Sequence, residues 1–483
     1  MSSETSMTTL LTDLTALLGE KHVVTDKAAL APRLTDNRGR WHGDVLAAVL
    51  PADTSEVAEV MKIAARHRAL VFTQGGNTGN AAGATPVVET QDVSRSILIL
   101  TDRMRRIEAI DTVNDTVTVQ AGVPVAAIRE AAAQKGRLFP LSLASDGTAT
   151  AGGVLATNAG GVHVVRWGNA RAQCLGLEAV LADGRVLNML RGLRKDNTGY
   201  DVKQLFIGSE GTLGVITRAV FKLEPLPAAR TVLWLTFGEL ETAEILFEKL
   251  EKAAGGMLSA FEVMHRTPLA RVASVYPERT SGVPMSDAWS ALVEFSCPSV
   301  REAEKIEETI EALSEKFFEE GLITDAVASR SEAQCRQLWA VRESIPEAYK
   351  KTGGNVKHDI SVPRSVLAQF VRETNAALAK RFPWVEPSIF GHFGDGNLHY
   401  NVGVLAGQNP RLCFDFESEI NALVYENVMR FSGSAAAEHG VGRMKRALLE
   451  RTKSETELQL MRSVKRVLDP CGRLNPGAVV LTD

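Results

Sequence analysis

The chain has 483 residues, with 54 Lys and Arg against 58 Asp and Glu and a net charge of -4. This length exceeds what one hydrophobic core usually supports, so two or three domains are expected. The small charge, without a basic tract, argues against a charge-driven nucleic-acid binder, and no apolar run is long enough to span a bilayer. The N-terminus lacks the basic region of a targeting signal, and the five scattered cysteines form no C-x-x-C pair. We expect a reduced, cytoplasmic, multidomain enzyme.

The first region alternates short apolar strands with helices, after a helical lead-in over residues 1–45. The stretch 54–67 (TSEVAEVMKIAARH) predicts an amphipathic helix capped by Thr54 or Ser55. Further strands are expected over 44–51, 69–76, 96–102, 106–122 and 177–189. The prolines of LEPLP indicate a boundary near residue 225.

In a second region the pattern strand, helix, strand occurs twice, which predicts helices layered on an antiparallel sheet. Its strands are expected over 230–237, 258–264, 288–296 and 323–329, and its helices over 239–255 and 299–321. Short helices follow from about residue 430. We therefore expect three parts: 1–225, with a core over about 45–225, then 226–430, and 431–483.

Two of only nine histidines lie in SIFGHFGDGNLHYNV, residues 388–402, which predicts a strand, a tight turn and a second strand. His392 and His399 lie near the two ends of the turn. Glu438 and His439, in AAAEHGVGRMKR, offer a third partner. Two imidazoles and a carboxylate suit a cation such as Zn²⁺ or Mn²⁺. The alternative interpretation is a pair of histidines that hydrogen-bond the turn.

Three stretches of the first region are rich in small residues: 73–80 (TQGGNTGN), 145–161 and 197–217. Each one alone could be a tight turn or a crowded packing site. Together, three such loops in one strand-rich domain could enclose an extended ligand that carries a pyrophosphate. The sequence contains neither a Walker A motif nor G-x-G-x-x-G, which disfavours a P-loop or Rossmann fold.

The three stretches resemble the flavin domain of the vanillyl-alcohol oxidase (para-cresol methylhydroxylase) superfamily. GHFGDGNLHYNV, EHGVGRMK and DPCGRLNPG resemble its branch of FAD-dependent D-2-hydroxyacid dehydrogenases, which act on D-lactate, glycolate or D-2-hydroxyglutarate. The resemblance covers roughly residues 45–480. It implies an α+β fold with a vanillyl-alcohol-oxidase-type FAD-binding domain, a ferredoxin-like α+β substrate (cap) domain and a C-terminal helical segment that returns to the flavin.

The resemblance also implies which residues contact FAD: Gly75, Gly76, Asn77, Thr78, Gly79, Ser145, Gly152, Gly153, Thr157, Asn158, Gly161, Glu210, Gly211, Gly214, Ile216 and Asn475. Thr73 and Gln74 depart from the pattern, since many relatives have arginine and glycine there. Members that attach flavin covalently often use a histidine in the first loop. This chain has none there, so FAD is expected to bind non-covalently.

The same resemblance places a divalent metal on His392, His399 and Glu438, with Zn²⁺ preferred over Mn²⁺, and makes His439 the base. A bound cation lowers the pKa of a substrate hydroxyl, and a histidine can then take its proton. Arg342 and Lys357 match residues that hold the substrate carboxylate. Lys357 opens an apolar strand, a place less typical of a surface charge, and Asn401 is a weaker candidate. Pro346 stands where relatives acting on D-2-hydroxyglutarate have a hydroxyl residue.

The sequence therefore predicts FAD- and metal-dependent oxidation of a D-2-hydroxy acid to the 2-oxo acid, with D-2-hydroxyglutarate as the leading substrate. The alternatives are a D-lactate dehydrogenase, the flavin subunit of a glycolate oxidase, and a flavin electron-transfer or scaffold protein without substrate chemistry. Without cysteine clusters, the electrons must leave to an external acceptor, such as electron-transfer flavoprotein or a quinone. A homodimer is a candidate assembly.

Overall fold

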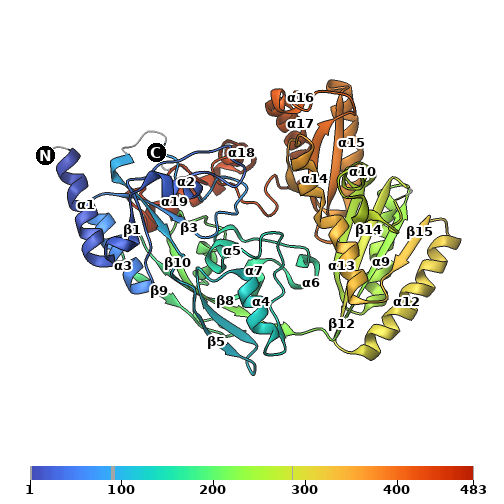
Figure 1. Cartoon of the computed structure of the whole chain (residues 1–483), viewed down its shortest axis with the longest axis horizontal. Coiled ribbons are helices and arrows are strands. Elements are labelled where there is room, and N and C mark those ends of the chain that lie inside the picture. Colours follow the sequence, from blue (N-terminus) through green and yellow to red (C-terminus); the bar gives the residue numbers. More distant parts are fainter. Residues whose placement is uncertain (1–2, 89–92, 286, 482–483) are drawn as a thin grey trace. The chain divides into compact units, whose positions relative to one another are not determined.

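A computed structural model describes residues 3–88, 93–285 and 287–481 (Figure 1). Contacts divide the chain into two units. The first unit consists of Met1–Gly161, Gly168–Pro225 and Glu438–Asp483, and the second of Val162–Trp167 and Leu226–Ala437. The contacts thus group a six-residue piece of the N-terminal half with the second unit, and they group the last part of the chain with the first unit.

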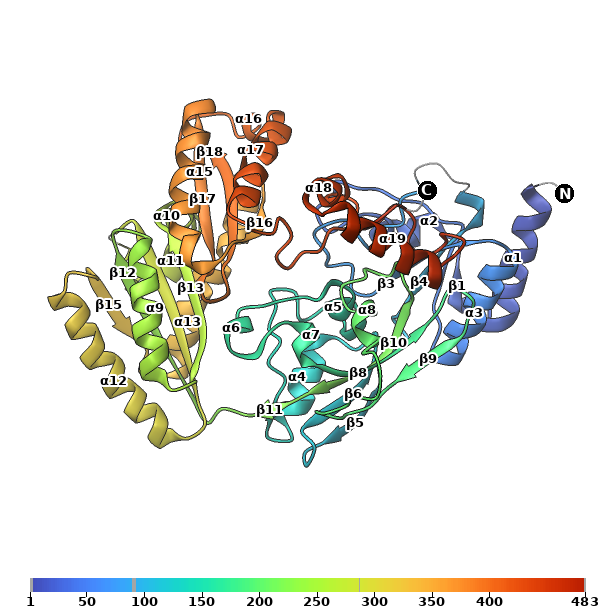
Figure 2. The ribbon, with the colours of Figure 1, turned by 180° about the vertical axis from the view of Figure 1, so that it is seen from behind.

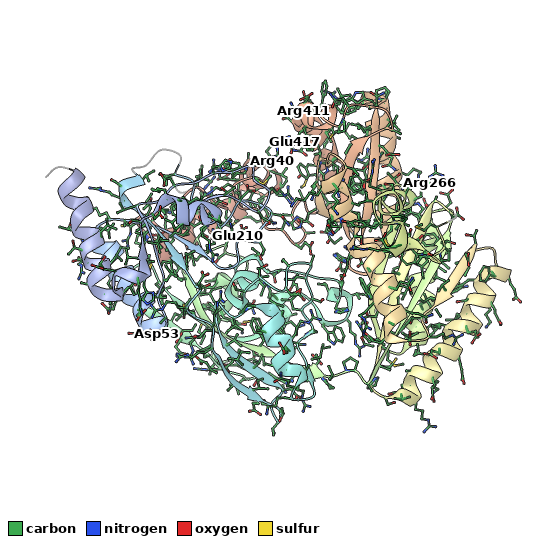
Figure 3. All side chains as sticks on the ribbon, viewed as in Figure 1. Arg40, Asp53, Glu210, Arg266, Arg411 and Glu417 are labelled. Atoms are coloured by element: carbon green, nitrogen blue, oxygen red, sulfur yellow. The ribbon has the colours of Figure 1, made fainter. Side chains whose placement is uncertain are left out.

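The first unit contains a four-stranded sheet in the order β1-β2-β4-β3, of which the last three strands run parallel. Helix α3 (Thr54–Arg66) packs against it through a buried apolar stripe. Asp53 caps α3 by accepting a hydrogen bond from the Glu56 amide, so the predicted cap at Thr54 or Ser55 is wrong by one or two residues (Figure 3). A carboxylate there also interacts favourably with the helix dipole. The remaining elements are α1 (Ser3–Leu18), β1 (Val23–Val24), α2 (Lys27–Leu34), β2 (Ala47–Val49), β3 (Leu70–Gln74) and β4 (Ser96–Leu100).

A five-stranded antiparallel sheet in the order β5-β6-β10-β8-β9 forms the rest of this unit's framework. Its inward side chains, among them Val119, Leu177 and Phe221, form one core with helix α4 (Val125–Ala133). The strands are β5 (Ile107–Asp111), β6 (Thr116–Gln120), β8 (Cys174–Val180), β9 (Val186–Met189) and β10 (Val215–Lys222), and the small pair β7 (Arg137–Leu138) and β11 (Glu224–Pro225) lies outside it.

The second small-residue stretch is partly helical, so the prediction of three loops is wrong here. Helix α5 (Ala151–Thr157) is capped by Thr150, whose hydroxyl accepts a hydrogen bond from the Gly153 amide. Gly152 is needed inside this helix because an added Cβ would lie 2.8 Å from the Ala121 side chain. A good cap and close packing therefore outweigh the poor helix propensity of two glycines. The third stretch also contains a short helix, α8 (Lys203–Phe206).

The C-terminal segment packs among the N-terminal elements of the first unit, as the red and blue ribbons of Figure 2 show. Helices α18 (Arg446–Thr452) and α19 (Glu455–Leu468) lead to a bridge between Leu474 and Val71 of β3. Lys465 is buried, and its ammonium donates to the Asp469 carboxylate and to the carbonyls of Thr212 and Leu474. These bonds satisfy a charge that would otherwise be costly to bury.

The second unit is built on a seven-stranded antiparallel sheet in the order β15-β12-β14-β13-β17-β18-β16. Its strands are β12 (Ala229–Phe237), β13 (Leu258–His265), β14 (Trp289–Cys297), β15 (Asp325–Ala328), β16 (Asp359–Ser361), β17 (Val385–His392) and β18 (Asn397–Val404). The sheet order brings β13 beside β17, although more than one hundred residues separate their sequences. This pairing positions the site described below.

Helices cover both faces of this sheet (Figure 1). One face packs a large apolar core against α9 (Glu241–Ala254), α12 (Val300–Glu319), α15 (Leu367–Arg381) and α17 (Glu417–Arg430). The other face packs a smaller core against α10 (Arg266–Val275), α13 (Glu332–Glu343) and α14 (Ile345–Lys351). The prediction of an antiparallel sheet with layered helices is confirmed. The candidate polar residues lie on the face with the smaller core.

Candidate functional site

Strand β18 separates apolar and polar side chains by alternation. Leu398, Tyr400 and Val402 are fully buried in the large core, whereas His399 and Asn401 point to the opposite face of β18. The predicted strand, turn and strand are confirmed. Two positions of this hairpin favour glycine because their φ angles are positive, at +153° for Gly391 and +79° for Gly396.

His392, His399 and Glu438 come together as predicted. Their possible ligand atoms all lie within 4.8 Å of one another, and the two imidazole centroids are 5.5 Å apart. Glu438 follows directly on Ala437, the last residue of the second unit, whose amide bonds to the Asp359 carbonyl of β16 at 3.4 Å. Two imidazole nitrogens and a carboxylate oxygen are a donor set that suits Zn²⁺, with positions left for a substrate oxygen. The residues therefore fit the expected cation.

A buried carboxylate that the sequence reasoning missed lies behind this group. Glu262 of β13 pairs in register with His392 and is fully buried. One of its oxygens lies 2.5 Å from His392 Nδ1, and the other accepts a hydrogen bond of 2.6 Å from Arg342 Nε. Burial alone would raise the pKa of Glu262, but the charges of Arg342 and His392 lower this pKa to about 2. The carboxylate is thus ionised and can only accept hydrogen bonds.

The structure joins Arg342, a predicted substrate residue, to the metal group through Glu262. Its guanidinium lies 5.2 Å from the centre of the Phe390 ring, and its Nη2 atom is buried without a hydrogen-bond partner among the described residues. A buried, unpaired N–H is costly, and a ligand carboxylate would relieve this cost.

The other two predicted substrate residues are Asn401 in β18 and Lys357, which lies just before β16. Asn401 is 5% exposed, and its side-chain oxygen accepts a hydrogen bond of 3.2 Å from the His358 amide. Lys357 has an exposed side chain, so its expected withdrawal from the surface is wrong, whereas the neighbouring His358 is buried. Lys357 precedes β16, and alternation sends its side chain away from that of His358.

The three small-residue stretches of the first unit do meet. Gly75 and Gly76 lie so close to Thr150 and to the Thr148 carbonyl that an added Cβ would collide with them. The third stretch bonds to helix α5 through the Glu210 amide and the Ala156 carbonyl at 2.8 Å. Two of the glycines expected near FAD pack tightly elsewhere, Gly161 on Ser142 and Gly214 on Phe206.

Several polar residues expected at FAD use their side chains within the protein. Asn77 donates to the carbonyls of Pro32 and Thr35, and Asn158 accepts from the Arg171 amide. Thr157 donates to the Gly153 carbonyl within α5. For the rest, the structure places Ser145 and Thr78 half-buried, Ile216 buried in β10, Gly79 in an exposed loop and Gly211 in a turn. Gln74, which departs from the family pattern, is buried and donates to the carbonyls of Arg33 and Ala84.

Glu210 connects the third stretch to the loop that follows His439 (Figure 3). Its buried carboxylate accepts hydrogen bonds from the amides of Val441 at 2.8 Å and Gly442 at 2.9 Å. Burial raises the pKa of Glu210 from its ordinary value. Asn475 completes this cluster. Its side-chain nitrogen donates to the Glu210 and Gly83 carbonyls, and its side-chain oxygen accepts a hydrogen bond from Arg443. His439 Nε2 lies 3.5 Å from a Glu438 oxygen.

Replacing Glu210 by alanine is expected to lower the free energy of unfolding by roughly 1–3 kcal/mol, because two buried amides would lose their acceptor. Chemical denaturation of FAD-loaded protein measures this. The matched control is Glu59→Ala on the exposed surface of the same unit, where a side-chain pair with Lys62 contributes little. Equal midpoints for Glu210→Ala and wild type would contradict the role of Glu210 in holding this loop.

Comparison with family models divides the chain between residues 190 and 226. Residues 45–190 match the family model described as FAD binding domain, and residues 226–479 match that of FAD linked oxidases, C-terminal domain. The para-cresol methylhydroxylase structure superposes with a TM-score of 0.76 at 16% identity, over 99% of this chain and 97% of that one. The 4-ethylphenol oxidase of Gulosibacter chungangensis superposes with a TM-score of 0.73 at 18% identity, over 99% and 98% of the two chains. The fold is thus the expected α+β fold of FAD-linked oxidases, and FAD is supported as the cofactor.

Curated relatives narrow the class. The chain is 37% identical to the mitochondrial D-2-hydroxyglutarate dehydrogenase of Bos taurus, over 94% of this chain and 80% of that protein. It is 34% identical to the D-2-hydroxyglutarate dehydrogenase of Xanthomonas citri pv. viticola, over 92% and 91% of the two chains. It is 36% identical to a putative mitochondrial D-lactate dehydrogenase of Schizosaccharomyces pombe, over 94% and 85%. The chain therefore belongs to the D-2-hydroxyacid dehydrogenase family of FAD-linked oxidoreductases.

Proposed function

We propose that this protein oxidises D-2-hydroxyglutarate to 2-oxoglutarate, using FAD and a divalent cation held by His392, His399 and Glu438. The observation that carries the proposal is the direct link, through Glu262, between this candidate cation group and the arginine expected to bind a carboxylate. A 2-hydroxy acid carries a hydroxyl and a carboxylate close together, which is what the two parts of this site would recognise. The relatives named for D-2-hydroxyglutarate support the choice of substrate.

The roles of the chain's own residues follow from their chemistry. Arg342 binds a substrate carboxylate through its free N–H edge, with Lys357 and Asn401 as additional contacts. His439 takes the proton of the substrate hydroxyl. When bound, FAD would supply N5 as the hydride acceptor, and the cation would lower the pKa of the hydroxyl. His392, His399 and Glu438 would hold the cation, with Zn²⁺ preferred and Mn²⁺ as the alternative.

The electrons must then leave the flavin to an acceptor outside the chain. The five cysteines are dispersed, four of them buried, and none pairs with another in a cluster within the described residues. Electron-transfer flavoprotein or a quinone are the acceptors that we propose. Among the described residues, no helix combines the length and apolar character needed to cross a bilayer.

Anaerobic reduction of the flavin tests the substrate. The purified, metal-loaded protein is mixed separately with D-2-hydroxyglutarate, D-lactate, D-malate, glycolate and the L-forms, and the flavin band at about 450 nm is followed. We expect D-2-hydroxyglutarate to bleach it fastest and a chelator to abolish the bleaching. Faster bleaching by D-lactate would instead assign D-lactate as the substrate. That result would agree with Pro346 and with the similarity to the putative D-lactate dehydrogenase of Schizosaccharomyces pombe. No bleaching by any hydroxy acid would overturn the dehydrogenase proposal.

A further inference from the structure

We infer that Glu262 is a positioning residue that orients the metal ligand His392 and the substrate anchor Arg342 with one carboxylate. The inference deepens the proposed function and rests on it. Glu262 is placed by the register of β13 against β17, which sets it directly opposite His392. It is fully buried, and its two oxygens serve two different partners. A rigid strand pair thereby fixes the spacing between the two groups.

The hydrogen bond to His392 determines which imidazole nitrogen is available to a cation. A Glu262 oxygen lies 2.5 Å from His392 Nδ1, so the carboxyl group engages this ring nitrogen and holds the ring in one orientation. Nε2 is then the ring nitrogen that would bind a cation. Carboxylates that hold a metal-binding histidine in this way raise its affinity for the metal, and their loss typically lowers this affinity about 10–100-fold.

The hydrogen bond to Arg342 determines which edge of the guanidinium faces a ligand. Glu262 engages Nε, and Phe390 lies against the guanidinium, at 5.2 Å from its carbon. The buried Nη2 atom, without a partner among the described residues, is left for a carboxylate. Because the same Glu262 side chain holds both groups, a substrate must place its hydroxyl and its carboxylate at one fixed separation. Glu262 therefore acts through His392 and Arg342 on the selection of 2-hydroxy acids.

The same face of the sheet offers a matched control in Glu294 of β14. This carboxylate is also buried and also bonds a histidine, His163, at 2.9 Å. It accepts a further hydrogen bond of 2.8 Å from the Trp339 indole. His163 does not belong to the candidate metal group. Substituting Glu294 therefore perturbs an equivalent buried pair without touching His392 or Arg342.

The test compares the Zn²⁺ affinity of FAD-loaded wild type, Glu262→Gln and Glu294→Gln, measured by competition with a chromophoric chelator. A glutamine has one acceptor oxygen for two donors, so one partner of residue 262 must face an N–H₂ group. We expect Glu262→Gln to weaken Zn²⁺ binding about 10–100-fold and Glu294→Gln to leave it within twofold. The absorption spectrum of bound Co²⁺ should change in Glu262→Gln alone. In Zn²⁺-saturated Glu262→Gln, the KM for the hydroxy acid should rise.

A folded Glu262→Gln that binds Zn²⁺ as tightly as wild type would overturn the inference. If that variant does not fold, Glu262→Asp replaces it, because the shorter carboxylate keeps the buried charge but cannot reach both partners. Unchanged Zn²⁺ affinity in Glu262→Asp would overturn the inference equally. The Zn²⁺ measurement needs no substrate turnover. It therefore stands even if no hydroxy acid reduces the wild-type flavin, an outcome that would reject the proposed function separately.

Discussion

His439→Ala is expected to remain yellow and to bind Zn²⁺ as wild type does, while flavin reduction by D-2-hydroxyglutarate slows by roughly 10²–10⁴-fold. A positioned general base contributes about this much to proton transfer, and alanine leaves the hydroxyl without an acceptor. His439 is not one of the residues in the candidate metal group, although it follows Glu438 directly. Anaerobic stopped-flow measurement of the reduction rate at saturating substrate separates this step from substrate binding.

Two controls make this experiment specific for a base. His42→Ala removes a histidine of the same unit that contacts Thr35, and it should leave the reduction rate unchanged. Added imidazole should restore part of the lost rate in His439→Ala, because a free base can enter the space left by the side chain. Flavin reduction by His439→Ala at the wild-type rate would show that another group takes the proton.

Sequence patterns predicted those parts of the molecule that depend on local spacing. The glycine-rich turn between two apolar runs gave the correct hairpin around His392 and His399, since glycine permits the positive φ angles of a tight turn. The apolar periods of the second region likewise gave strands β12 to β15 and helices α9 and α12. The assignment of Glu438 to the metal and of His439 to the base came from the family resemblance, since nothing in the spacing of residues 399 and 438 fixes their contact.

The residues that were missed depend on long-range pairing. Glu262 lies in LSAFEVM, which has the composition of an ordinary core strand, and its partners lie 80 and 130 residues further along the chain. Only the order of β13 and β17 in the sheet brings them together. A carboxylate in the middle of an apolar strand was the available signal, because a buried acid requires partners. Helix α5 was missed because glycine content argued against it, while its capping threonine argued for it.

His392→Ala is expected to lose its metal and to slow flavin reduction by roughly 10³-fold or more. Removal of one of three candidate ligands leaves His399 and Glu438 to hold the cation alone. A cation that activates the substrate hydroxyl contributes several kcal/mol, and each 1.4 kcal/mol corresponds to about a tenfold change in rate. Elemental analysis of purified protein measures the metal, and stopped-flow absorbance measures the reduction.

His163→Ala is the matched control, because both histidines contact a buried glutamate. His392 lies 2.5 Å from Glu262 of β13, and His163 lies 2.9 Å from Glu294 of the neighbouring strand β14. Both substitutions leave a buried carboxylate with one partner fewer, so both should lower stability to a similar extent. Metal content should fall only in His392→Ala, because His163 lies outside the candidate metal group. Equal metal content in His392→Ala and wild type would reject the site, whereas equal loss in both variants would assign the effect to folding.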